Sequence, residues 1–175
     1  IIYTSGSTGN PKGVPITHAN LSPLLHWGYK HMKFDATDQL VQNLSFYFDW
    51  SVWEIFMALT SGSTLHMTSR DLLMDAPALV SYMDTHDITV IHITPTQVQY
   101  LVETGIPMNS LRCLVVGAEK MTQSLAERCF KNTSPGCRLF NMYGPTEATI
   151  MAAVLEFTPT DLEGYTYLSS VPIGY

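Results

Sequence analysis

Charged residues are scarce in this chain, and basic ones are the scarcest. Asp, Glu, Lys and Arg together make up 14% of the 175 residues, whereas hydrophobic residues make up 46%. This balance excludes an intrinsically disordered chain and fits a domain with a buried core. Nine residues are Lys or Arg against fifteen Asp or Glu, and the formal net charge is −6. A general binder of nucleic acid or of a membrane surface needs a basic face, so the composition argues against both classes.

Long hydrophobic runs and cysteines are also few. No apolar run is long enough to span a bilayer, and no basic-then-apolar segment opens the chain, so neither a membrane span nor a signal peptide is predicted. The three cysteines, Cys113, Cys129 and Cys137, lack paired spacing, and we expect reduced thiols in a cytoplasmic protein. No Cys or His cluster has the spacing of a metal site. Because the chain opens within a predicted strand and closes in a predicted loop, we expect residues 1–175 to be a fragment of a longer domain.

Short β-branched runs alternate with segments of helical periodicity. Strands are predicted over residues 40–44, 64–67, 88–93, 113–117, 138–143 and 150–155, and helices over residues 50–59, 76–86, 95–103 and 122–131. In the first of these helices, the spacing predicts a core-facing stripe made of Val52, Ile55, Phe56 and Leu59. The alternation predicts an α/β fold, a mostly parallel sheet flanked by helices. In such sheets ligands bind beyond the carboxyl ends of the strands.

The first candidate site is a loop of small residues near the start of the chain. Residues 3–13 read Tyr-Thr-Ser-Gly-Ser-Thr-Gly-Asn-Pro-Lys-Gly. Glycines let a backbone approach an anion closely, hydroxyl groups donate to phosphate oxygens, and Lys12 adds a positive charge. The common P-loop motif is excluded, because Pro11 stands where that motif has glycine. The residue types fit a polyphosphate-binding loop or a flexible Gly/Ser linker, although linkers rarely follow a buried strand directly.

The second candidate is the start of the predicted helix over residues 50–59. Asp49 comes just before it, and Trp50 and Trp53 follow within one turn. A carboxylate between two indoles is a plausible pocket for a small cation such as an ammonium group. An aspartate at a helix start is also an ordinary N-cap, and aromatic residues there usually pack in the core. The residues alone favour the N-cap interpretation.

The third candidate is the end of the strand over residues 138–143. A Gly-Pro turn follows it, and polar residues lie at the carboxyl end of the strand, where ligands bind in such sheets. Tyr143 could stack on a base, Thr146 could hydrogen-bond a phosphate and Glu147 could hold Mg²⁺. A capped turn that begins a short helix explains the same residues equally well.

Taken together, the three segments resemble the core motifs of the adenylate-forming superfamily. Residues 3–13 match the motif YTSGSTGxPKG, residues 48–51 match FDxS, and residues 141–147 match NxYGPTE, in the same order. Residues 115–119 are similar to the VVGGE strand end, with Ala118 in place of a glycine. FDxS together with NxYGPTE is most similar to the motifs of amino-acid-activating adenylation domains of nonribosomal peptide synthetases.

The resemblance implies an activity and its partners. An α-amino acid would be activated as its aminoacyl-AMP with ATP and Mg²⁺, then passed to the phosphopantetheine thiol of a carrier protein. Carrier and condensation domains of a parent synthetase would be partners, and nucleic acid and membranes would not. The C-terminal subdomain, with the main catalytic lysine of the family, would be absent, so we expect this fragment alone to be inactive. The alternatives are an acyl- or aryl-CoA ligase of the same superfamily and a non-catalytic nucleotide-binding or interaction module.

The resemblance also assigns roles to matching residues. The catalytic residues would be Lys12, Thr146 and Glu147, with Glu147 also the metal ligand. ATP would be bound by Thr4, Ser5, Gly6, Ser7, Thr8, Gly9, Lys12, Gly117, Ala118, Glu119, Asn141, Met142, Tyr143, Gly144 and Thr146. The amino acid would be bound by Asp49, Trp50, Trp53, His92, Val115, Gly117, Met142, Ile150 and Met151.

Within that set, Asp49 would pair with the α-ammonium group of the amino acid, which favours the ion-pair interpretation over the N-cap. Because two indoles and two methionines fill volume, we expect a small polar amino acid such as serine or threonine. His92 would contact its side chain, and a satisfied core histidine is the alternative.

Overall fold

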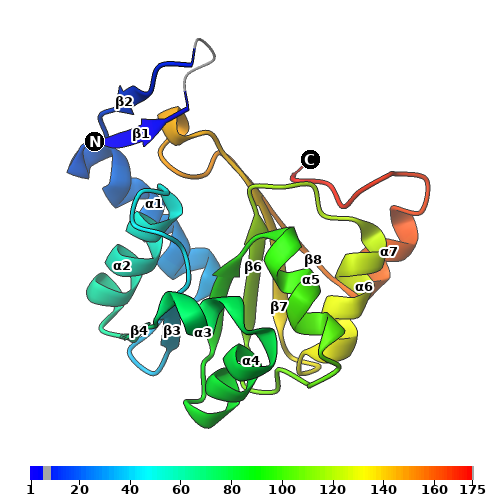
Figure 1. The fold of residues 1–175 in the computed structure, drawn as a ribbon. Helices are drawn as coiled ribbons and strands as arrows, with labels where there is room; N and C mark the ends of the chain where they lie inside the picture. The colour runs from blue at the N-terminus through cyan, green and yellow to red at the C-terminus, as the bar shows by residue number, and fades with distance from the viewer. Residues whose placement is uncertain (6–8, 175) are drawn as a thin grey trace.

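The computed structural model describes residues 1–5 and 9–174, and its centre is a six-stranded sheet covered by helices on both faces (Figure 1). The strand order is β4-β3-β5-β6-β7-β8. The strands are β3 (Gln39–Gln42), β4 (Thr64–Met67), β5 (Val90–Ile93), β6 (Cys113–Gly117), β7 (Arg138–Tyr143) and β8 (Ala153–Phe157). The first five strands in this order are parallel to one another, and β8 runs antiparallel to β7. The prediction of a mostly parallel α/β sheet is confirmed.

The helices divide between the two faces of this sheet. One face is covered by α1 (His18–Met32) and α2 (Trp50–Ser61). The other face carries α3 (Arg70–Met74), α4 (Ala76–Thr85), α5 (Pro95–Glu103), α6 (Gln123–Asn132) and α7 (Pro159–Gly164). Helix starts follow local chemistry: the predicted cap Thr122 accepts a hydrogen bond from the backbone N–H of Leu125, and Pro95 begins α5 as expected.

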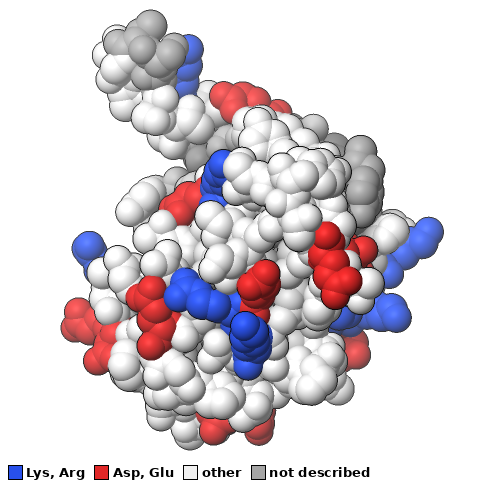
Figure 2. All heavy atoms as spheres, turned by 90° about the vertical axis from the view of Figure 1, so that its right-hand side faces the viewer, with Lys and Arg blue, Asp and Glu red and all other residues white. Residues whose placement is uncertain are grey.

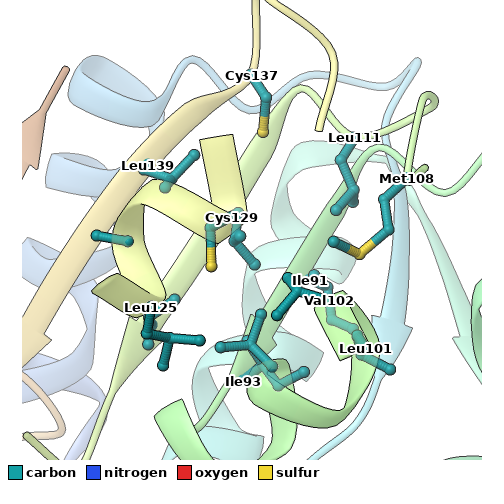
Figure 3. Packing of buried hydrophobic residues seen from close by; sticks show 14 of the residues in the cluster. Ile91, Ile93, Leu101, Val102, Met108, Leu111, Leu125, Cys129, Cys137 and Leu139 are labelled. Carbon is teal, nitrogen blue, oxygen red and sulfur yellow. The ribbon is translucent and has the colours of Figure 1, made fainter. Parts of the chain in front are cut away.

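Alternate residues along each strand face two separate hydrophobic cores. The core under α4 to α7 is built on strand residues such as Ile91, Ile93 and Leu139, which point toward α5 and α6 (Figure 3). Cys129 and Cys137 lie in the same core as free thiols, and burial raises the pKa of Cys129 to about 12. The expected reduced thiols are therefore inert packing groups here.

The second core, between the sheet and α1 and α2, corrects the predicted stripe of α2. Leu59 is 70% exposed, and the buried face of α2 instead carries Trp50, Trp53, Glu54 and Met57. The helix packs through that face on β3, β4 and α1. Glu54 turns inward because its carboxylate accepts the backbone N–H groups of Asn43 and Leu44. Periodicity alone could not foresee a buried glutamate.

A separate hairpin, β1 (Ile2–Thr4) and β2 (Lys12–Val14), projects from the body of the molecule (Figures 1 and 2). On the face in Figure 2, basic and acidic side chains are interspersed, without a large patch of one sign. Such a face gives no sign of phosphate-backbone binding. Within residues 1–5 and 9–174, no helix combines the length and the apolar character needed to cross a membrane.

Candidate functional site

The candidate site comprises two neighbouring pockets at the carboxyl ends of β6 and β7, beside the start of α2. A small pocket of about 20 Å³ is lined by Phe48, Asp49, Trp50, Ala118, Met142, Tyr143, Gly144, Ile150 and Met151. A larger pocket of about 310 Å³ is lined by Ala118, Glu119, Lys120, Met121, Asn141, Met142, Tyr143, Ser170, Val171 and Ile173. Three residues, Ala118, Met142 and Tyr143, line both pockets, so the two pockets are direct neighbours. They lie where parallel sheets bind ligands.

A tight turn after β7 shapes the small pocket. A Cβ on Gly144 would lie 2.4 Å from Cα of Met151 and 2.5 Å from the carbonyl oxygen of Ile150, so only glycine fits. Thr149 and Ile150 have φ values of 62° and 75°, a left-handed backbone that is unfavourable for β-branched residues. Such strain is concentrated at functional sites. Ala118, with φ of 68°, also lies in this region, which favours glycine.

Asp49 is the one charged side chain among the residues that line the small pocket. It is 6% exposed, and its carboxylate makes no capping hydrogen bond to α2 within the described chain. Burial raises the pKa of Asp49, and the nearby Glu147 carboxylate adds to the rise, whereas hydrogen bonds from Thr146 and from the backbone N–H of Trp50 oppose it. No Lys, Arg or His is among the residues that line the small pocket, so the buried carboxylate has no cation beside it there, and a ligand ammonium group would supply one.

Thr146 and Glu147 lie in the 3-10 helix η1 (Thr146–Ala148), which follows the turn after β7. Both are close enough to Asp49 to influence its pKa, so η1 and the start of α2 meet at the small pocket. Glu147 is exposed, and no group of three His, Cys, Asp or Glu residues suited to a metal occurs in the described chain. A single carboxylate fits Mg²⁺, which proteins usually bind through one or two carboxylates together with substrate phosphates.

The larger pocket carries an unused hydrogen-bond acceptor. Asn141 donates from Nδ2 to the carbonyl oxygens of Val171 (3.1 Å) and Pro172 (2.9 Å), while its buried Oδ1 has no partner within residues 1–5 and 9–174. Tyr143 at the shared rim is exposed and free to stack. Glu119 accepts the backbone N–H of Thr96 at 3.1 Å, which holds the end of β6 against α5.

Three residues assigned to the amino-acid pocket lie beneath it. His92, Trp53 and Val115 are fully buried and are absent from the lining of the small pocket. Trp53 donates from Nε1 to Nε2 of His92 at 2.7 Å, and the ring centroid of His92 lies 6.0 Å from that of Trp50. These residues support the pocket floor and do not form its surface. Gly117, at the end of β6, contacts the floor from the other side.

Sequence reasoning assigned no role to Glu54, which lies next to this cluster. Its Oε1 is 3.9 Å from Nδ1 of His92, too far for a hydrogen bond. Burial raises the pKa of Glu54 to about 8 and lowers the pKa of His92 to about 3, so both are neutral near pH 7. The contact is therefore between neutral groups and is no salt bridge. The sequence pattern gave no signal for this residue, because its burial is decided by the contacts of α2 with the end of β3.

The described residues of the predicted phosphate loop line neither of these pockets. Thr4 pairs with Lys12 across the hairpin, Lys12 is exposed, and Gly9 has φ of 82°. Ser5 is exposed beyond β1. The predicted residues Gly6, Ser7 and Thr8 lie outside the described residues.

Several known proteins are similar to this chain in sequence or in fold. Malpinin synthetase of Mortierella alpina is 34% identical over 174 residues, which cover 99% of this chain and 2% of that protein. The Vibrio cholerae adenylation domain AlmE, solved with glycyl-adenosine-5'-phosphate, is 28% identical with a TM-score of 0.86, over 99% of this chain and 32% of that one. The four-domain nonribosomal peptide synthetase holo-AB3403, solved with AMP and glycine, is 26% identical with a TM-score of 0.85, over 99% of this chain and 12% of that one.

This chain therefore spans a third or less of each of these relatives. The model of the family described as AMP-binding enzyme matches residues 1–174. The match covers both pockets, the hairpin and the turn after β7. The chain belongs to the family of AMP-binding enzymes.

Proposed function

We propose that this chain forms part of an adenylation domain that activates an α-amino acid as its aminoacyl-AMP. The observation that carries the proposal is the buried Asp49 carboxylate, which has no cation beside it in the lining of its small pocket; a larger pocket that shares lining residues lies next to it. An α-ammonium group carries the positive charge that would neutralise the Asp49 carboxylate. The larger pocket has room for a nucleotide base. The amino-acid and AMP ligands of the two solved relatives support the same class of substrate.

In this proposal the base of ATP occupies the larger pocket. Asn141 Oδ1, which has no partner in the described chain, accepts a hydrogen bond from the exocyclic amino group of adenine. Tyr143 stacks on the ring from the exposed rim. Ala118 and Glu119, just after β6, line the same pocket, and Met142 lines both pockets. Gly117 is the last residue of β6, directly before Ala118, and Gly144 lines the small pocket.

The reaction is an in-line displacement at phosphorus. A carboxylate oxygen of the amino acid bonds to the α-phosphorus of ATP, the bond from that phosphorus to the bridging oxygen breaks, and pyrophosphate leaves with the electron pair. Thr146 holds an α-phosphate oxygen by hydrogen bonding, and Lys12 on β2 brings positive charge toward the leaving phosphates. Positioning and charge stabilisation of this kind dominate phosphoryl transfer. Glu147 would hold Mg²⁺, which supplies charge neutralisation on the phosphates when bound.

The phosphate-loop residues Thr4, Ser5, Gly6, Ser7, Thr8 and Gly9 remain assigned to the ATP phosphates in this proposal. We also propose that residues 1–175 are one part of a single adenylation domain, whose C-terminal subdomain lies elsewhere in a longer protein. The acceptor of the aminoacyl group is then a phosphopantetheine thiol on a carrier protein, and condensation domains are neighbours in the same synthetase. Three buried free thiols fit a cytoplasmic setting.

The test is amino-acid-dependent exchange of labelled pyrophosphate into ATP, measured on the complete protein and on its Asp49→Asn variant. Loss of a buried charge partner predicts a fall in kcat/KM for the amino acid of on the order of 100-fold or more. Asp84→Asn, at an exposed position on α4, is the matched control and should leave exchange unchanged.

Exchange that depends on a fatty or aryl acid and is unaffected by Asp49→Asn would assign the chain to acyl- or aryl-CoA ligases, because such acids have no ammonium group. Nucleotide binding without exchange under any acid would favour a non-catalytic module.

A further inference from the structure

The floor of the small pocket is a contact between Trp50 and Gly117. A Cβ built on Gly117 would lie 2.7 Å from Cη2 of Trp50 and 2.6 Å from the carbonyl oxygen of Met142. The six-membered ring of Trp50 therefore rests directly against the backbone at the end of β6. No side chain larger than hydrogen at residue 117 is compatible with this placement, so the two residues act as a pair that closes the space beside Asp49.

The space that remains is very small. The pocket holds about 20 Å³. A cavity needs roughly 10–15 Å³ of the same kind of volume to hold one water molecule. There is thus room for about one or two water-sized groups beside the Asp49 carboxylate, and Phe48, Ile150 and Met151 are among the residues that line this space.

The tryptophan is held in place from below. Trp50 is 4% exposed, and its ring packs on His92, whose Nε2 is fixed by the hydrogen bond from Trp53. Swinging the ring aside would open a void in the second core and disturb this buried hydrogen bond. Packing therefore opposes movement of the Trp50 ring away from Gly117, which limits how far the pocket can widen for a larger side chain.

The polar atoms below the floor are closed to a substrate. Nε1 of Trp50 and Nδ1 of His92 are both buried atoms without a partner in the described chain. A hydroxyl group in the pocket would meet neither donor, so the geometry gives no advantage to serine or threonine. We therefore replace the expected contact between His92 and a substrate side chain by a positioning role for His92.

We propose that the amino acid activated at this site is glycine, an inference that rests on the proposed adenylation. Asp49 binds the α-ammonium group, and Trp50 on Gly117 occupies the volume that a side chain would need. Alanine, with a single methyl group, is the next best substrate. Larger amino acids are rejected by contact with the indole.

The test compares glycine, alanine, serine and leucine in pyrophosphate exchange by the complete protein. Glycine should have the highest kcat/KM, at least about tenfold above alanine, with serine and leucine lower still. Trp50→Ala should reverse this order in favour of larger side chains, whereas Trp27→Ala on α1 should leave the order unchanged. As a readout without turnover, a glycyl sulfamoyl-adenosine analogue should raise Tm in the wild type, and the leucyl analogue should do so only in Trp50→Ala.

Each other outcome is decisive. Highest kcat/KM with leucine or an aromatic amino acid overturns the glycine assignment and leaves adenylation standing. The highest kcat/KM with serine would also overturn the glycine assignment and leave adenylation standing. It would mean that a donor, Trp50 Nε1 or His92 Nδ1, reaches the side chain of the substrate. Exchange with no amino acid overturns the proposed function itself, which is a different failure.

Discussion

Trp53 donates its indole N–H to Nε2 of His92 at 2.7 Å, which fixes the tautomer of a histidine that no solvent reaches. Because Nε2 accepts, the proton of the neutral ring is on Nδ1. The same tryptophan packs on α1, where a Cβ on Gly28 would lie 2.4 Å from Cη2 of Trp53. One side chain thus joins α1, α2 and β5 beneath the candidate site.

Trp53→Phe is predicted to destabilise the protein through that hydrogen bond. The ring is kept and the donor is lost, so Nε2 of His92 becomes a buried acceptor without a partner. We expect the free energy of unfolding to fall by about 1–3 kcal/mol in urea denaturation. Trp27→Phe is the control, since its half-buried ring stacks on exposed His31, and it should change stability by less than about 0.5 kcal/mol. Equal losses in both variants would show that the bond contributes nothing.

The neutral pair of Glu54 and His92 predicts a specific dependence of stability on pH. Burial raises the pKa of Glu54 from its ordinary value of 4.5 to about 8, so its contribution is complete below pH 4.5 and is lost as the pH rises to 8. Burial lowers the pKa of His92 from 6.5 to about 3, so its contribution is lost as the pH falls below 6.5.

Between pH 4.5 and 6.5 the free energy of unfolding falls with pH through Glu54 and rises with pH through His92. The two effects cancel, so stability should be greatest there. From pH 6.5 to 8 only Glu54 acts, and the free energy of unfolding should fall by up to about 1.4 kcal/mol per pH unit. Urea denaturation across this range is the measurement. Glu54→Gln, which cannot ionise, should remove the fall above pH 6.5. A variant with the wild-type slope would assign that slope to other groups.

Gly144→Ala is predicted to abolish the turn that shapes the small pocket. The added methyl would lie 2.4 Å from Cα of Met151, a backbone atom that cannot move aside cheaply. We expect loss of pyrophosphate exchange together with a fall in Tm of several degrees. Gly136→Ala has open space around its Cβ and should leave both unchanged. Normal exchange in Gly144→Ala would mean that the pocket tolerates a shifted turn.

Asn141 is predicted to select adenine. ITP carries a carbonyl oxygen where ATP carries the exocyclic amino group, and this oxygen would face the unpartnered Oδ1 of Asn141. The wild type should prefer ATP over ITP by at least about tenfold in kcat/KM, and Asn141→Ala should lose most of that preference. The KM for the amino acid serves as the internal control and should change little. An unchanged ATP/ITP ratio would remove Asn141 from base recognition.

The sequence by itself determined the fold class and the location of the two pockets. β-branched runs alternating with amphipathic segments require a covered parallel sheet, and ligand sites then follow at the carboxyl ends of β6 and β7. Tyr143 was identified as a candidate in this way, whereas Asp49 and Met142 were assigned through the resemblance to adenylation domains; all three line the small pocket. The long helix α1 was not predicted, because Pro23 interrupts its pattern while its packing on α2 supplies the stability.

Only the tertiary structure decided which candidates reach the pocket surface. Nothing in their residue types distinguishes Trp50, Trp53 and His92 as pocket residues. In the structure Trp50 lines the pocket and the other two lie beneath it. The choice depends on contacts between segments far apart in the chain, such as Trp50 on Gly117 and Trp53 on Gly28. Local patterns carry no information on such contacts, because they arise when the sheet brings the end of β6 to the start of α2. For the same reason, the volume beside Asp49 could be read only from the folded chain.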